Sequence, residues 1–407
     1  FAIAPLFQGT HTAIIAAIHI LLLAVFTKVL LASYQKLRIP YNSLALCICL
    51  FYIWMALSIS WSPAPAISLY MFVWLSIFPL CFFIYSLKQP GDWAFLAVGL
   101  LGLAIIFSLI GIGQSLVMNE IPTSMFRTRN TYGATLNLVA LPTTTFFLLV
   151  LKQSKNNLSI LLGTILFILF YAMLQTASRG SFISLLLGLT FIIVKSWSHN
   201  ERSSFLIVLI ILAIALLFNY IQTEGYTLTR LAEVSEGTSI PSIADRFLMW
   251  KSAWEIIKNA PLIGTGIGTY FIVAPAVRHI HDVQLGYFLD NDFLQFWLET
   301  GFIGLSLMAL IMFATIKFFT RVFRHKDLKL QDRLEITGLM AGLFAVVTHS
   351  LVNFNFYIIY IIMIMGLMCA RIQEITGIYY SGLMRSFIPA HKLSKKLFVL
   401  MAGIIPV

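Results

Sequence analysis

Apolar residues are grouped along this chain in long blocks that are separated by short polar breaks. A helix needs about 20 apolar residues to cross a hydrocarbon core of about 30 Å, and most of the blocks have roughly that length. The predicted membrane-spanning segments are residues 11–33, 43–60, 66–87, 93–118, 132–151, 158–176, 180–197, 204–222, 292–319, 335–350, 352–371 and a segment that begins near 396. We therefore predict an all-α polytopic membrane protein with about 11–12 transmembrane helices.

One polar stretch, residues 223–291, is much longer than the other breaks. It divides the chain into N-terminal transmembrane helices at 1–222, a large and partly helical loop, and C-terminal transmembrane helices at 292–407. Within the loop, SIADRFLMWKSAWEIIKNA at Ser242–Ala260 carries apolar residues at spacings of three and four. This spacing predicts an amphipathic helix, and tryptophans beside cations are typical of a helix at a membrane interface. The expected apolar face consists of Phe247, Trp250, Trp254 and Ile257.

Composition and charge agree with a membrane protein and predict its orientation. Hydrophobic residues make up 59% of the chain and charged residues 11%, with a mean hydropathy of +0.91; soluble domains carry about 25% charged residues. The loops on one side of the predicted bundle hold 18 Lys and Arg, and those on the other side, which include 223–291, hold 8. Because Lys and Arg concentrate on the cytoplasmic side, the large loop is expected to face the periplasm of a bacterium. A net charge of +11 would suggest nucleic acid binding in a soluble protein, but in a membrane protein it first predicts orientation. We expect the lipid bilayer as a partner and no nucleic acid.

The chain begins at Phe1 rather than Met, so we expect further residues, or a further helix, upstream. Its four cysteines lie in apolar runs and match no metal-ligand spacing. We predict no metal site and no cofactor.

Arginines on the predicted periplasmic side are candidates for binding an anionic group. Guanidinium groups bind phosphate oxygens through paired hydrogen bonds, and helix N-termini add partial positive charge. A single arginine in such a place also fits snorkelling to the interface, but several on one side favour an anion site. The candidates are Arg127, Arg129, Arg179 and Arg246.

The stretch LDNDFLQFWLETGFIG at Leu289–Gly304 gathers three of the 16 acidic residues of the chain. Asp290 or Asn291 is well placed to cap the helix that follows. A polar stripe with spacings of three and four continues along that helix, and we predict that it faces an outward cavity. A carboxylate beside lipid has a raised pKa and suits accepting a proton from a hydroxyl. The stripe consists of Asp292, Gln295 and Glu299.

Two further patterns have both structural and functional interpretations. In THSLVNFNFY, His349 and Asn353 are expected on one helical face, where they form a helix-packing hydrogen bond or face a cavity. GTGIGTY at Gly264–Tyr270 resembles a dinucleotide fingerprint but follows a helix and lacks the βαβ context. We predict flexible backbone near a head group there, rather than a nucleotide site.

Taken together, several blocks resemble the O-antigen ligase and O-antigen polymerase superfamily. The blocks are SRGSF at 178–182, DRFLMWKSAWEIIKNAPLIGTGIGTY at 245–270, DNDFLQFWLETGFIG at 290–304 and HSLVNFNF at 349–356, and SISWSP at 58–63 agrees with the N-terminal half. The likeness spans most of the chain, and the order and spacing of the blocks make it specific.

The resemblance implies a metal-independent, inverting glycosyltransferase of the bacterial inner membrane with its active site facing the periplasm. Such an enzyme moves a glycan from undecaprenyl diphosphate to an acceptor hydroxyl. If the acceptor is a growing glycan, the enzyme is an O-antigen-type polymerase, and the motif HSLVNFNF favours this activity. A chain-length regulator is then a further candidate partner. A lipid A-core acceptor makes it a ligase, and a protein Ser or Thr an O-oligosaccharyltransferase. A flippase for lipid-linked glycans is the alternative from another class, which the lack of inverted repeats disfavours.

The resemblance also implies roles for individual residues, with one departure from the family pattern. Arg179 and Arg246 are expected to clamp the diphosphate. The ligase pattern is His, then Asn, Ser or Gln, then nine residues, and then Gly-x-x followed by Gly, Thr or Tyr. Asn291 and Gly301–Gly304 fit this pattern, but Asp290 occupies the His position. We predict Asp290 as general base, next to Asn291 in the catalytic set, with His281 second and Asp292, Glu299, His279 or His349 as alternatives. Substrate contacts are predicted for Arg127, Arg129, His281, His349, Asp292, Glu299 and Trp250.

Overall fold

The computed structural model describes residues 12–32, 37–87, 93–196, 202–232, 241–278 and 287–387, and almost all of its regular structure is helical. The helices that correspond to the predicted spans are α2 (Thr12–Ala32), α3 (Ser43–Ser58), α4 (Pro65–Leu75), α5 (Ile77–Leu87), α6 (Trp93–Met118), α7 (Arg129–Lys152), α8 (Asn156–Gln175), α9 (Arg179–Ser196), α10 (Arg202–Gln222), α14 (Asp292–Phe323), α15 (Leu330–His349) and α16 (Ile359–Tyr379). The shorter elements are β1 (Leu37–Pro40), η1 (Ile59–Trp61), α11 (Tyr226–Ala232), α12 (Pro241–Asn259), α13 (Tyr270–Val273), η4 (Ala274–Ala276), η5 (Asn355–Tyr357) and β2 (Met384–Phe387).

The prediction of an all-α polytopic membrane protein is confirmed. Within the described ranges, 9 helical segments are long and apolar enough to cross a membrane. The predicted spans 11–33 and 335–350 correspond to α2, in which Ala16–Val29 is apolar, and to α15, whose first turns carry Asp332, Arg333 and Glu335. The span predicted from 396 lies outside the described residues.

The predicted span 66–87 is interrupted between α4 and α5 at Ser76. Pro79 has no amide hydrogen, so it cannot donate to the carbonyl of Leu75 one turn earlier. That carbonyl instead accepts a hydrogen bond from the Tyr52 hydroxyl at 2.9 Å. A side chain from α3 therefore satisfies the backbone group that the proline leaves open.

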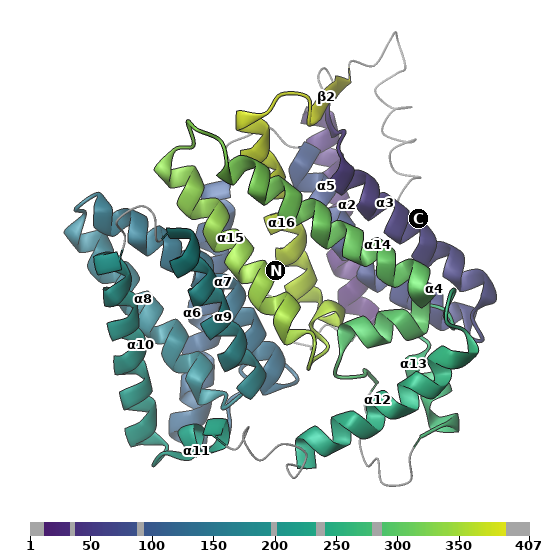
Figure 1. Cartoon of the computed structure of the whole chain (residues 1–407), viewed down its shortest axis with the longest axis horizontal. Coiled ribbons are helices and arrows are strands. Elements are labelled where there is room, and N and C mark those ends of the chain that lie inside the picture. Colours follow the sequence, from purple (N-terminus) through teal and green to yellow (C-terminus); the bar gives the residue numbers. More distant parts are fainter. Residues whose placement is uncertain are drawn as a thin grey trace.

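The core of the bundle is built around α7, which packs against α8, α9 and α15 and lies between the α8–α10 flank and the α3–α5 flank in Figure 1. Small residues let α15 approach it closely. A Cβ atom at Gly338 would lie 2.8 Å from the Cα of Pro142, and one at Gly342 would lie 3.2 Å from the carbonyl oxygen of Leu138. This small-residue contact is typical of helix packing in membranes.

The described parts of the two predicted sets of loops include segments at opposite ends of the bundle. β1 and β2, from two loops assigned to the cytoplasmic set, pair as an antiparallel ribbon with Leu37 opposite Phe387. At the other end, where α11, α12 and α13 lie in Figure 1, Arg179 donates from Nε to the carbonyl of Arg230 at 2.8 Å. The segment carrying Ser62 also reaches that end, where it contacts the backbone at Gly266.

The predicted amphipathic helix is α12, but the apolar face that it buries differs from the expected one. Met249, Ala253 and Ile256 pack in a cluster with Leu289 and Leu298 across the start of α14. Of the expected face, Ile257 is buried, whereas Phe247 and Trp254 are 50% and 43% exposed. The helix therefore has two apolar faces, one against the protein and one directed outward, and the spacing pattern alone did not separate them.

The predicted span 352–371 begins seven residues later than expected. α15 ends at His349, and α16 begins only at Ile359. Between them, Asn353 donates from Nδ2 to Asn355 Oδ1 at 2.7 Å, and Asn355 donates to Ser350 Oγ at 3.2 Å. These local side-chain bonds compete with helix formation, so the prediction that His349 and Asn353 share a helical face was wrong.

Candidate active site

The start of α14 is interrupted at Gly301, which has φ 69° and ψ −178°. In a continuous α-helix the amides of Phe302 and Ile303 would donate to the carbonyls of Leu298 and Glu299. Here those two amides donate to Pro261 at 2.9 Å and Leu262 at 3.2 Å instead. The carbonyls of Leu298 and Glu299 accept from Thr265 at 3.0 Å and Gly266 at 2.8 Å. The segment Pro261–Gly266 thus supplies the hydrogen-bond partners that the two interrupted helical bonds would have provided. It pairs with the free carbonyls before the break and with the free amides after it.

Glycine is required on both sides of this junction. A Cβ atom at Gly301 would lie 2.1 Å from the carbonyl oxygen of Leu262, and one at Gly264, which has φ +70°, would lie 2.5 Å from the amide nitrogen of Gly301. Gly266 and Gly268 also have positive φ, and a Cβ at Gly266 would meet Ser62 at 2.7 Å. The glycines of Gly264–Tyr270 therefore permit close contact between backbones. The predicted flexible loop near a head group is instead a tightly bonded segment.

Glu299 anchors the rest of this segment from inside. Its carboxylate accepts four hydrogen bonds and is 1% exposed. The donors are the Gly268 amide (2.8 Å), the Tyr270 amide (3.2 Å), Gln295 Nε2 (3.0 Å) and the Tyr357 hydroxyl (2.9 Å). Because protein donors fill its acceptor positions, Glu299 holds the loop in place rather than presenting an open carboxylate.

The predicted polar stripe lies in the protein interior rather than along an open cavity. Gln295 accepts from the Leu289 amide at 2.8 Å and fixes the residue before Asp290. Asp292 accepts from the Phe356 amide at 3.0 Å, and its own amide donates to the carbonyl of Ser350 at 2.9 Å. The stripe therefore joins the start of α14 to the break between α15 and α16. Of the two candidate caps, Asn291 caps α14 by accepting from the Leu294 amide at 3.0 Å.

Asp290 and Arg246, predicted separately as base and clamp, form an ion pair. Arg246 Nε lies 3.2 Å from Asp290 Oδ2, and the two side chains are 22% and 24% exposed. Burial raises the pKa of Asp290 above that of an ordinary aspartate, and the charge of Arg246 offsets part of this rise. Asp290 also has φ 29°, a left-handed conformation that is unfavourable for a residue with a side chain. The bend at Asp290 thus holds a carboxylate of raised proton affinity beside a guanidinium group from α12.

Three more arginines gather at the same end of the bundle. Arg179 begins α9, and Arg129 begins α7 within electrostatic reach of both Arg179 and Arg230. Arg230 on α11 donates from Nη1 to the Tyr226 hydroxyl at 3.1 Å. Helix N-termini carry partial positive charge, so the first residues of α7 and α9 add to the positive potential. No sequence pattern singled out Arg230. The signal that could have identified it is that it is one of the eight Lys and Arg residues in the loops predicted to face the periplasm.

His349 lies beneath the start of α9 and is 2% exposed. A Cβ atom at Gly180, the residue after Arg179, would lie 2.6 Å from both Cδ2 and Nε2 of its ring. Its Nδ1 atom is buried and has no hydrogen-bond partner among the described residues. Arg246 also lies within electrostatic reach of this imidazole. The structure thus brings His349 between the helix of Arg179 and the Arg246–Asp290 pair.

The remaining predicted residues lie at the edge of the site or outside the described part. Arg127 is exposed and its guanidinium lies 5.7 Å from the ring centre of Tyr287. Trp250 contacts Phe247 edge to face at 5.4 Å. His279 and His281 lie outside the described residues. Within the described ranges, no group of three or more His, Cys, Asp or Glu residues could hold a metal ion.

Part of the chain is similar to known proteins. Residues 164–309, which include Arg179, Arg246 and Asp290, match a family model described as O-antigen ligase. A curated relative, the ComP-specific O-oligosaccharyltransferase of Acinetobacter baylyi (strain ATCC 33305 / BD413 / ADP1), is 26% identical over 238 residues. The alignment covers 56% of this chain and 41% of the relative, so the chain spans about two fifths of that protein's length. These matches, each over part of the chain, support its resemblance to the O-antigen ligase superfamily.

Proposed function

We propose that this protein transfers a glycan from undecaprenyl diphosphate to an acceptor hydroxyl at the periplasmic face of the bacterial inner membrane. The Arg246–Asp290 pair carries the proposal, because it places a candidate base beside a candidate diphosphate ligand. The further arginines at the same end and the family match support it.

In the proposed reaction, the Asp290 carboxylate accepts the proton of the acceptor hydroxyl. The acceptor oxygen forms a bond to the anomeric carbon while the bond from that carbon to the diphosphate oxygen breaks. Arg246 and Arg179 neutralise the negative charge that develops on the departing lipid diphosphate. A single displacement of this kind inverts the anomeric configuration and needs neither a metal nor a nucleotide.

The acceptor of this reaction distinguishes three activities. We favour a growing polysaccharide as the acceptor, which makes the protein an O-antigen-type polymerase. If the acceptor is lipid A-core, the protein is a ligase. The name of the curated relative supports the third candidate, a protein acceptor for O-oligosaccharyltransfer. Incubating the purified protein with lipid-linked glycan and each acceptor in turn, and identifying the covalent product by mass spectrometry, separates these activities from each other. A flippase would move the donor across a vesicle membrane and leave it unchanged.

An apolar cavity next to the site supports a lipid-linked donor. It has a volume of about 310 Å³ and runs between α3, α5, α14, α15 and α16. The residues that line it include Phe296 and Phe356, and Tyr357, next to Phe356 in the chain, donates to Glu299. We propose that part of the polyprenyl tail occupies this cavity while the diphosphate lies near the arginines.

Filling this cavity is expected to weaken donor binding. Met312 lines the cavity, whereas the adjacent Phe313 is 63% exposed and does not. Met312→Trp should raise the KM for the lipid-linked donor about tenfold with little change in kcat, because excluding two methylene groups costs about 1.6 kcal/mol. Phe313→Trp, the matched control, should leave KM unchanged. Equal KM values for Met312→Trp and the wild type would place the tail elsewhere.

The pH dependence of turnover tests the role of Asp290. A general base must be deprotonated, so kcat/KM should fall as the pH falls through the pKa of Asp290. Because burial raises that pKa, the fall should occur at a higher pH than the value of about 3.9 for a free aspartate. Asp290→Asn should lower kcat by about 100-fold or more and remove this acidic limb. Retention of the limb in Asp290→Asn would assign it to another group.

A further inference from the structure

A second cavity lies at the end of the bundle opposite the Arg246–Asp290 pair. It has a volume of about 370 Å³ and is bounded by α6, α7, α15 and α16. Its inner wall is apolar and includes Leu138, Leu339 and Ile364, whereas Gln331, Glu335 and Arg371 line its outer end. The lining therefore changes from apolar to charged along the length of the cavity.

The cavity reaches the surface of the bundle between α6 and α7. Val98 and Phe146 line it and are 69% and 49% exposed. Both belong to helices with the length and hydropathy of membrane spans, so this side of the cavity faces acyl chains in a bilayer. The small side chains of Ala94 and Ala97 on α6 leave the space open.

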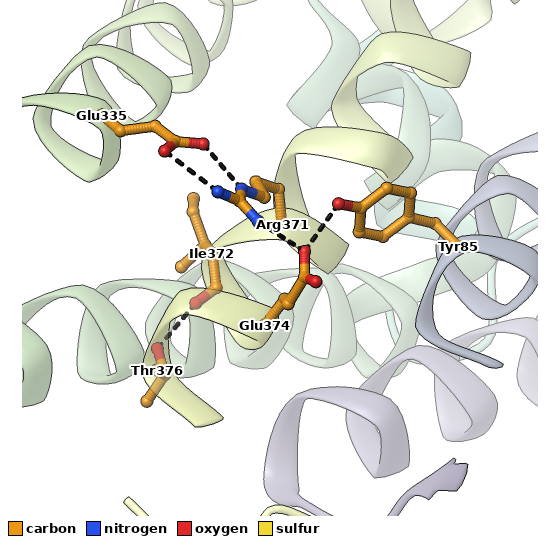
Figure 2. A network of polar contacts seen from close by, with 6 residues as sticks. All are labelled: Tyr85, Glu335, Arg371, Ile372, Glu374 and Thr376. Atoms are coloured by element: carbon orange, nitrogen blue, oxygen red, sulfur yellow. Dashed lines mark hydrogen bonds and ion pairs between the residues drawn. The ribbon is translucent and has the colours of Figure 1, made fainter. Parts of the chain in front are cut away.

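Glu335 and Arg371, which line the charged end, belong to a network that also includes Glu374, a residue outside the lining. Arg371 donates to both carboxylate oxygens of Glu335, at 2.6 and 3.0 Å, and from Nη1 to Glu374 at 2.7 Å. The Tyr85 hydroxyl also donates to Glu374, at 2.6 Å. Figure 2 shows Arg371 between the two glutamates, with Tyr85 reaching Glu374 from the far side. One guanidinium thus faces two carboxylates, which are each 19% exposed.

We propose that this cavity binds a phospholipid with a primary ammonium head group. The ammonium group would lie at the surplus carboxylate charge of Glu335 and Glu374, and one acyl chain would enter the apolar part past Val98 and Phe146. An anionic head group would be repelled by the surplus negative charge of the network. Arg371 already directs three of its five N–H groups to the two carboxylates. The site is separate from the proposed transfer reaction and does not depend on it.

Lipid competition tests the proposal. The purified full chain is exchanged into an equimolar mixture of phosphatidylethanolamine and phosphatidylglycerol with identical acyl chains, and bound lipids are counted by native mass spectrometry. We expect about a fivefold preference for phosphatidylethanolamine, as appropriate for a partly exposed charge pair. Equal binding of the two lipids, or a preference for phosphatidylglycerol, would overturn the proposal.

Two variants separate the head-group site from the chain site. Glu374→Gln keeps the paired Arg371–Glu335 bonds and an acceptor for Tyr85 but removes the surplus charge, so the head-group preference should disappear while the protein stays folded. Ala97→Phe fills the apolar part and should lower the binding of both lipids. Leu109→Phe, on an exposed position of α6 away from the cavity, is the matched control and should bind as the wild type. An unchanged preference in Glu374→Gln, or unchanged binding in Ala97→Phe, would contradict the proposed occupant.

Discussion

Replacing Arg246 with alanine is expected to reduce glycan transfer by about 100- to 1,000-fold, the usual effect of removing one group that stabilises transition-state charge. The loss has two physical sources. The departing diphosphate loses a cation, and Asp290 loses the partner that offsets the effect of burial on its pKa. Arg246→Ala should therefore also shift the acidic limb of the pH profile to higher pH.

Controls for Arg246→Ala are available on the same helix and at the same position. Lys251 on α12 is exposed, and Lys251→Ala should transfer glycan at the wild-type rate. Arg246→Lys retains the charge but not the planar guanidinium, so it should recover only part of the activity. Because both groups act on one reacting centre, Arg246→Ala combined with Asp290→Asn should lose less than the product of the two separate effects. Full activity in Arg246→Ala would exclude the proposed clamp.

Substituting alanine for Gly301 is expected to be the most damaging single change to the fold of the site. The added methyl group would lie 2.1 Å from the carbonyl oxygen of Leu262, a backbone atom that cannot rotate away. Four interlocking backbone hydrogen bonds hold the two segments at this junction. We therefore expect Gly301→Ala to lower the unfolding temperature of the purified protein measurably and to abolish transfer. Gly264→Ala should behave in the same way, because its Cβ would meet the backbone of Glu299 and Gly301.

Two other glycines should respond to alanine in the opposite way. A Cβ atom added at Gly102 on α6 or at Gly377 on α16 would meet no atom within 4 Å outside its own helix. Alanine at either place should leave transfer unchanged and raise the unfolding temperature slightly, because it lowers the entropy of the unfolded chain. A comparable loss in Gly377→Ala and Gly301→Ala would show that the junction is not the cause.

The sequence predicted the helical architecture well because membrane spans follow from the length of apolar blocks. It failed between His349 and Ile359, where apolar residues continue but the side chains of Asn353 and Asn355 bond locally and the helix ends. For the site, the order of motifs indicated Arg246 and Asp290, which proved to be in contact. The role of Glu299 could not be predicted, because its donors at Gly268, Tyr270 and Tyr357 are distant in the sequence and only the fold brings them together.

The junction between Pro261–Gly266 and α14 also has a consequence for biosynthesis. Until that segment docks, the amides of Phe302 and Ile303 and the carbonyls of Leu298 and Glu299, close to the start of a membrane-length helix, lack the partners that they have in the folded protein. Unpaired backbone groups are costly near lipid. The first turns of α14 therefore reach their final hydrogen bonding only when Pro261–Gly266 has docked, so the loop and the helix complete each other's folding.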